Sequence, residues 1–211
     1  MKLVLLEALM ETLIMVIAST LFAVAIGMIL AIILVLTDKE GPKPNKFIYK
    51  TLDMIINTLR SFPFVILMVV VVPITRGIVG KSIGTVAAIV PLTIASAPFV
   101  ARIIEGSLKE IDKGIIEAAK SLGATKTQII FKIMLNEALP SIISGLTLTI
   151  ISIIGYSAMA GSIGGGGLGA AAITYGYNRF NTEFMIYTVI VLIVLVQLIQ
   201  TIGNYIYKKL S

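Results

Sequence analysis

The chain contains four uncharged, apolar runs that are each long enough to cross a lipid bilayer. They cover residues 12–36, 82–101, 138–178 and 184–207. A bilayer core of about 30 Å needs about 20 apolar residues in a helix. The composition agrees, because 57% of the residues are hydrophobic and 13% are charged, against about 25% charged residues in globular proteins. We therefore exclude a soluble globule and expect an all-α integral membrane protein.

The run 138–178 is too long for one crossing, so we divide it into a helix and a glycine-rich loop beyond about Ser162. We expect a further span at 55–75, although only 61–75 is uncharged and Arg60 then lies near the membrane interface. The first run is too long for the apolar region of a signal peptide, which is about 7–15 residues. A single domain over residues 1–211 is expected, with five spans at about 12–36, 55–75, 82–101, 139–162 and 184–207.

The basic residues indicate how these spans are oriented. With the N-terminus outside and the C-terminus inside, 13 of the 17 Lys and Arg residues fall on the inside and four on the outside. Cytoplasmic loops carry the excess of Lys and Arg in membrane proteins. Removing the span at 55–75 would break this alternation. We expect a multi-pass protein of the cytoplasmic membrane, with the long loop 102–138 on its inner side.

Several functional classes are disfavoured by the residues that the chain lacks. It has no His and no Cys, which removes the commonest general base, the commonest metal ligand and any thiolate site. We expect no catalytic residue, no metal and no cofactor. Gly80-Lys81-Ser82 ends like a phosphate loop, but Thr75 stands where its first glycine should be. The basic residues are scattered between apolar runs, so we expect no nucleic-acid partner.

The spans also lack the groups that bind a coupling ion. Proton- and sodium-coupled carriers place ionisable side chains near the midplane, whereas the four clear spans hold only neutral polar residues such as Ser96, Thr147 and Gln197. These residues form hydrogen bonds between helices or line a pore. Energy for uphill transport would have to come from another subunit. An ATP-independent channel is an alternative, although the spans contain no ring of charged residues for a filter.

The loop 102–138 is the longest polar segment and predicts a helix, a glycine turn and a second helix. Asp112 is a good N-cap for a helix over 113–122, and Gly123 suits a left-handed stop. Thr125 to Gln128 has the pattern of a capping box. The first helix carries one narrow apolar face suited to a partner surface, made of Ile115, Ala118, Ala119 and Leu122.

The same loop carries a spaced motif. Glu117-Ala118-Ala119, three residues, Gly123, nine residues and Ile133-Met134-Leu135 resemble the EAA loop of bacterial ABC-importer permeases. Asn136 stands where that family has a proline, and Pro140 follows four residues later. The resemblance implies a type I importer permease fold with a coupling helix that docks on an ATP-hydrolysing subunit. The docking residues it implies are Glu117, Ala118, Ala119, Lys120, Leu122 and Gly123.

A second stretch of sequence indicates which group of importer permeases the chain resembles. Gly164 to Gly169, followed by Tyr175-Gly176-Tyr177, is similar to the segment before the last span of methionine-importer permeases, although Ala170 replaces an expected acidic residue. The resemblance implies two ATP-binding subunits, an extracytoplasmic substrate-binding protein and transport of methionine. Five helices are too few to enclose a solute path, which favours a homodimer. Another amino acid or small polar solute is the alternative substrate.

The glycines also suggest a region for the transport pathway. Gly161, Gly165 and Gly169 are spaced by four residues and allow close helix approach where they are helical. Met159 just before them is a candidate gate residue, and filling a helix contact is the alternative role.

Overall fold

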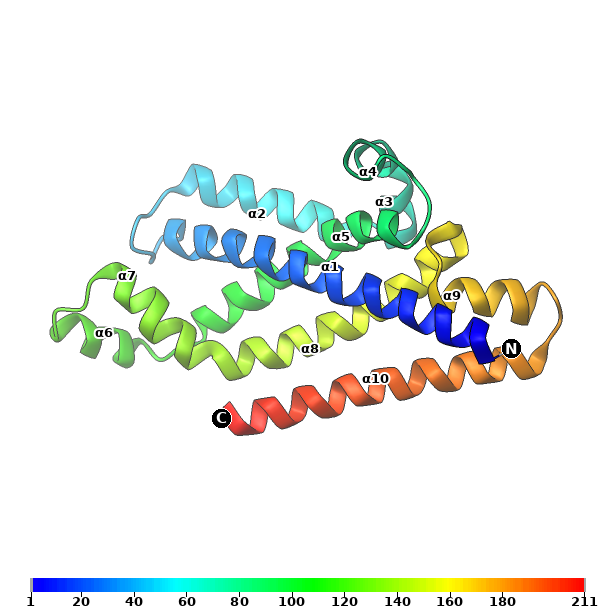
Figure 1. Cartoon of the computed structure of the whole chain (residues 1–211). Helices are drawn as coiled ribbons and strands as arrows, with labels where there is room; N and C mark the ends of the chain where they lie inside the picture. The colour runs from blue at the N-terminus through cyan, green and yellow to red at the C-terminus, as the bar shows by residue number, and fades with distance from the viewer. Residues whose placement is uncertain (1, 211) are drawn as a thin grey trace.

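Residues 2–210 are described by a computed structural model, and every regular element in this range is helical (Figure 1). The elements are α1 (Lys2–Thr37), α2 (Lys46–Ser61), α3 (Phe64–Val70), α4 (Val72–Val79), α5 (Thr85–Lys109), α6 (Lys113–Ser121), α7 (Lys126–Gln128), η1 (Ile129–Met134), α8 (Leu135–Ala160), η2 (Gly161–Gly165), α9 (Gly167–Ala171), η3 (Ala172–Tyr177) and α10 (Thr182–Leu210), where η denotes a π-helical segment. Four helices are long and apolar enough to cross a membrane, or five with the bent pair α2 and α3 as one span. The all-α class predicted from the sequence is confirmed.

The long helices form an elongated bundle (Figure 1). α5 packs against α1 and α8, and α10 packs on the outer side of α8. The N-terminus, α4 and α9 lie toward one end of the bundle, and α6, α7 and the link from α1 to α2 lie at the other. In the most apolar part of α5, 67% of the residues are buried, against 6% in α10. α5 is therefore the central helix, and α10 presents most of its apolar surface outward.

The two largest of four apolar clusters within residues 2–210 lie in the middle of the bundle and near α6. Near α6, Val100, Ile104 and Leu108 of α5 belong to one cluster with Ile129 and Ile130 of η1. Toward the middle of the bundle, Met15, Leu67, Leu92 and Ile153 belong to a second cluster drawn from α1, α3, α5 and α8. Since both clusters contain residues of α5 and of the segment η1–α8, these two segments support the end of the bundle where α6 lies.

The region predicted as one span over 55–75 is not one helix. α2 already begins at Lys46, where the Asn45 side chain accepts hydrogen bonds from the backbone N–H groups of Phe47 and Ile48 at 3.1 Å each. The chain then turns by 109° between α2 and α3. The turn falls at Pro63, which lacks an N–H group and forces Phe62 into an extended conformation with ψ 128°. The proline therefore breaks the span inside the predicted range.

Other helix limits also differ from those expected. α5 continues to Lys109, so the first part of the predicted loop 102–138 is helical. α7, η1 and α8 form one continuous helical segment, in which the Asn136 side chain donates to the Lys132 carbonyl oxygen at 2.8 Å. The π-helical turn η1 thus ends at Met134, two residues before Asn136, which stands where the resembled family has a proline. Beyond Ser162, the expected glycine-rich loop contains the short helical segment of α9 and η3.

Candidate functional site

The helix α6 is defined at both ends by local hydrogen bonds. The Asp112 side chain accepts a hydrogen bond from the backbone N–H of Gly114 at 2.6 Å. At the other end, Gly123 has φ +80° and donates to the Lys120 carbonyl at 2.9 Å, while Ala124 donates to the Ala119 carbonyl at 3.0 Å. These two bonds form a Schellman motif, which needs a left-handed residue at Gly123. The predicted caps of this helix are confirmed.

The next helical turn begins at the predicted capping box. The Thr125 hydroxyl accepts from the backbone N–H of Gln128 at 3.3 Å, and the Gln128 side chain accepts from the backbone N–H of Thr125 at 2.8 Å. Only residues 122–125 separate the two helical segments. α6 is therefore a rigid, sharply reversed extension of the fourth span.

The apolar residues of α6 point in two directions. Ala119 is 5% exposed and belongs to the cluster with Ile129 and Ile130, against which Ile116 also packs. Ile115 is 39% exposed, Leu122 is 89% exposed, and Ala118 is exposed as well. The structure thus separates Ala119 from the other residues of the predicted face. Ala119 holds α6 against the bundle, and Ile115, Ala118 and Leu122 form what we call the outer face of α6.

The charged docking residues predicted from the sequence lie on another side of α6. Glu117 and Lys120 are exposed and line a cleft of about 600 Å³ between α6 and the linker 38–42. Lys113 binds Glu40 at 2.9 Å, and the Lys126 ammonium donates to the Pro42 carbonyl at 2.6 Å. The hydrogen bond between Lys113 and Glu40 lowers the pKa of the Glu40 carboxyl and raises the pKa of the Lys113 ammonium. The linker is thus joined by polar contacts to α6 through Lys113 and to α7 through Lys126.

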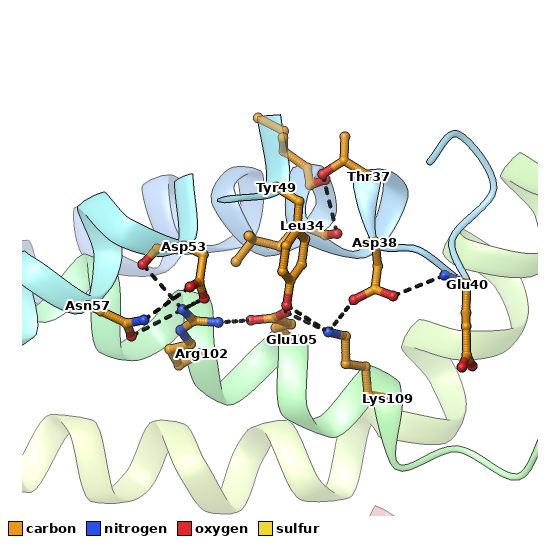
Figure 2. Close-up of polar contacts among 11 residues, drawn as sticks. Leu34, Thr37, Asp38, Glu40, Tyr49, Asp53, Asn57, Arg102, Glu105 and Lys109 are labelled. Carbon is orange, nitrogen blue, oxygen red and sulfur yellow. Dashed lines mark hydrogen bonds and ion pairs between the residues drawn. The ribbon is translucent and has the colours of Figure 1, made fainter. Parts of the chain in front are cut away.

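A buried ionic cluster ties this end of the bundle together, and the sequence reasoning missed it (Figure 2). Its centre is Glu105, which is 3% exposed. The Glu105 carboxylate accepts from Arg102 at 2.6 Å, Lys109 at 2.8 Å and the Tyr49 hydroxyl at 3.0 Å. A buried carboxylate requires such partners because its unpaired charge is costly. The signal in the sequence is the spacing of Arg102, Glu105 and Lys109, which places opposite charges on one helix face.

The two cations extend this cluster to neighbouring elements. Lys109 also binds Asp38, just after α1, at 2.7 Å. Arg102 also pairs with the Asp53 carboxylate of α2 and donates to the Asn57 side chain at 3.1 Å. We call these residues the Glu105 cluster. They are Asp38, Tyr49, Asp53, Asn57, Arg102, Glu105 and Lys109.

The glycine segment lies at the opposite end of the bundle, where α9 folds back on α8. Gly161, Gly165 and Gly169 are all buried. A Cβ atom on Gly169 would clash with the Ala158 carbonyl oxygen, and one on Gly161 would clash with the Ala170 backbone nitrogen. These glycines therefore permit close backbone approach, although a turn with φ +82° at Gly166 separates them onto two segments.

α9 begins on side chains of α1. Glu11 accepts from the backbone N–H of Gly167 at 2.6 Å, and the Thr12 hydroxyl accepts from that of Leu168 at 2.9 Å. A carboxylate at a helix N-terminus satisfies donors that have no partner within the helix. Met159 does not share this packing, since it is 47% exposed. The structure therefore brings the three glycines together and leaves Met159 on the surface of the chain.

The comparison with family models decides the class of this bundle. Residues 23–211 match the model described as binding-protein-dependent transport system inner membrane component. The chain belongs to this family. The resemblance read from Glu117-Ala118-Ala119 and Gly123 is thereby confirmed, and the chain is a multi-pass membrane protein.

Individual relatives cover nearly the whole chain. The probable D-methionine transport system permease protein MetI of Vibrio cholerae is 49% identical over 98% of this chain and 92% of its own length. The methionine import system permease protein MetP of Bacillus subtilis is 44% identical over 82% of this chain and 78% of its own length.

Solved structures of ABC transporters also match this chain. A crystal form of the inward-facing MetNI methionine ABC transporter matches with a TM-score of 0.97 and 43% identity, over all of this chain and 98% of that chain. An amino acid ABC transporter crystallised with histidines matches with a TM-score of 0.82 at 20% identity, which shows a shared fold. The arrangement of helices described above is therefore that of an ABC transporter permease.

The glycine packing yields the first prediction. Gly169→Ala forces a methyl group against the Ala158 carbonyl, and such overpacking costs about 1–3 kcal/mol. We expect a lower thermal unfolding temperature for the purified protein. Gly77→Ala is the matched control, because Gly77 is also helical and a Cβ atom there would have no neighbour within 4 Å. Equal unfolding temperatures for the two variants would contradict the close packing of α9 on α8.

Proposed function

We propose that this chain is the permease subunit of an ATP-binding-cassette importer for methionine and forms its translocation pathway. Relatives at 44–49% identity carry names for methionine or D-methionine transport, and the structure of the MetNI methionine ABC transporter matches the full chain. The observation within this chain that supports the proposal is the outer face of α6. It provides a rigid, exposed contact surface at the end of the bundle where the linker 38–42 lies.

The outer face has the properties of a docking surface for an ATP-binding subunit. Leu122 stands 89% exposed directly beside the Schellman turn, and Ile115 lies two helical turns before it on the same side. Ala118 between them is small enough for a partner to approach closely. Glu117 and Lys120 lie on another side of α6, where they line the cleft toward the linker 38–42, so the outer face itself is apolar. In this proposal, ATP is hydrolysed on that partner and Gly123 preserves the reversal of the chain.

The assembly we propose contains two copies of this chain, two ATP-binding subunits and an extracytoplasmic substrate-binding protein. Two copies are needed because one bundle of five spans is too small to enclose a solute path, and a twofold axis gives both copies an identical contact. The exposed apolar side chains of α1 and α10 are available for lipid and for the second copy. In this arrangement Met159 faces the pathway, and the close backbone packing at Gly161, Gly165 and Gly169 lies beside it.

The docking role of α6 is tested by placing a charge on its outer face. Leu122→Asp should weaken ATP-driven methionine uptake in vesicles that contain all three components. Loss of an interface anchor costs about 2 kcal/mol or more, which is about thirtyfold weaker binding of the ATPase. Thr127→Asp is the control, since Thr127 is also exposed but belongs to α7 and lies outside the outer face. Normal uptake by Leu122→Asp would refute the docking role, and ATP-driven uptake of a different amino acid would refute the substrate.

We also propose that the N-terminus is outside and that α6 is in the cytoplasm. This orientation is supported by the 13 basic residues that it places inside, against four outside. Because the chain has no Cys, single cysteines report topology without background. Cysteines at Lys43 and Lys120 should resist an impermeant thiol reagent added to intact cells, and one at Asn178 should react. Labelling at Lys120 from outside would reverse the orientation.

A further inference from the structure

A small hollow lies between α5 and α8, away from the docking face. It has a volume of about 110 Å³, and its wall includes Ser96 and Phe99 of α5 and Leu148, Ser152 and Tyr156 of α8. The wall carries no ionisable group other than the Tyr156 phenol. A hollow of this kind accepts an uncharged, mainly apolar group.

One hydroxyl in this wall has no partner. Ser96 is 1% exposed, and its hydroxyl forms no hydrogen bond among the described residues. The neighbouring Thr149 and Ser152 hydroxyls donate to carbonyl oxygens of their own helix at 3.0 and 2.9 Å. Buried polar groups in proteins are nearly always satisfied. The Ser96 hydroxyl is therefore available to a ligand that enters the hollow.

A cation lies beside the same wall. The Arg60 guanidinium is 5.0 Å from the centre of the Phe99 ring, and it forms no ion pair within residues 2–210. Arg60 is exposed in the single chain. An arginine within or at the edge of a membrane span is rare without a partner of opposite charge. Because Phe99 belongs to the wall of the hollow, the Arg60 guanidinium lies within one aromatic ring of that wall and has no carboxylate partner among the described residues.

The hollow also shares a helix face with the predicted pathway residue. Leu148, Ser152 and Met159 are separated by four and seven residues, so they lie on one side of α8. Leu148 is 58% and Met159 is 47% exposed, and Ser152 is exposed as well. The rest of the chain therefore leaves this side of α8 open, from the hollow to Met159.

We propose that the hollow and Arg60 form a transient binding site for the transported amino acid within the membrane. The inference rests on the proposed function and adds to it. The side chain of methionine enters the hollow, and its carboxylate pairs with the Arg60 guanidinium. An apolar cavity of about 150 Å³ in another protein holds benzene, which has six heavy atoms. A hollow of about 110 Å³ matches the four heavy atoms of the methionine side chain.

The Ser96 hydroxyl and the Arg60 guanidinium also suit the two ends of methionine chemically. A thioether sulfur is a weak hydrogen-bond acceptor. The Ser96 hydroxyl, which has no other partner among the described residues, can donate to it. A guanidinium forms paired hydrogen bonds with a carboxylate. The site therefore distinguishes amino acids by side-chain size and by a free carboxylate, and it contains no carboxylate of its own to hold a cationic substrate tightly.

The test is protection of a single cysteine from labelling. Ser152→Cys is placed in the assembled importer without nucleotide or binding protein, and the rate of reaction with a small water-soluble thiol reagent is measured. If methionine binds with a Kd of about 1 mM, about 10 mM methionine slows labelling about tenfold. Methioninol, which lacks the carboxylate, should protect far less. Adding Arg60→Gln should reduce the protection by methionine to the same low level.

The controls separate this site from the proposed function. Ser162→Cys is exposed and lies outside the hollow, so methionine should not slow its labelling. ATP-driven methionine uptake by the unaltered importer tests the function independently. Equal protection by methioninol and methionine would remove the role of Arg60. Labelling that methionine leaves unchanged, or a Ser152→Cys thiol that never reacts, would overturn the site even in an importer that transports methionine normally.

Discussion

The pairing of one buried carboxylate determines how the end of this bundle is built. Glu105 is 3% exposed and lies on the central helix α5, where it is held by Arg102, Lys109 and Tyr49 (Figure 2). Removing one partner from a buried ion pair costs about 3–5 kcal/mol, because the remaining charge has no compensation. The cluster therefore constrains α2 through Asp53 and the end of α1 through Asp38. The cluster thus fixes the positions of the ends of α1, α2 and α5 relative to one another.

That geometry supports the helix proposed to bind the ATPase. The linker 38–42 begins at Asp38 of the Glu105 cluster and contacts both α6, where Glu40 binds Lys113, and α7, where Lys126 donates to the Pro42 carbonyl. The exposed pair of Glu40 and Lys113 contributes little by itself. Ala119 supplies the apolar part of the support. In this account, a movement of α6 caused by its partner is passed to α1, α2 and α5. It is passed through the linker 38–42 and through the apolar cluster that contains Ala119.

Sequence reasoning succeeded where structure is determined by near neighbours. Asp112, Gly123 and the capping box at Thr125 act on near neighbours in the chain, so their roles could be predicted.

Prediction from the sequence failed where a partner comes from a distant element. Glu11 caps α9 from a position 156 residues away, and no local pattern indicates that contact. Ala119 has the same apolar character as Ala118, and only the packing of η1 separates the buried residue from the exposed one. The break at Pro63 lies inside an apolar run that predicts a single span, although the proline itself favours a break there.

The central claim is that the Glu105 cluster fixes the end of the bundle on which α6 rests. The most direct measurement is the number of ATP molecules hydrolysed per methionine imported by the reconstituted importer. Glu105→Gln keeps the shape of the side chain and removes its charge, and Glu110→Gln makes the same change at an exposed position of the chain. The account predicts a higher ratio for Glu105→Gln and an unchanged ratio for Glu110→Gln. The same ratio in both variants and in the unaltered importer would contradict it.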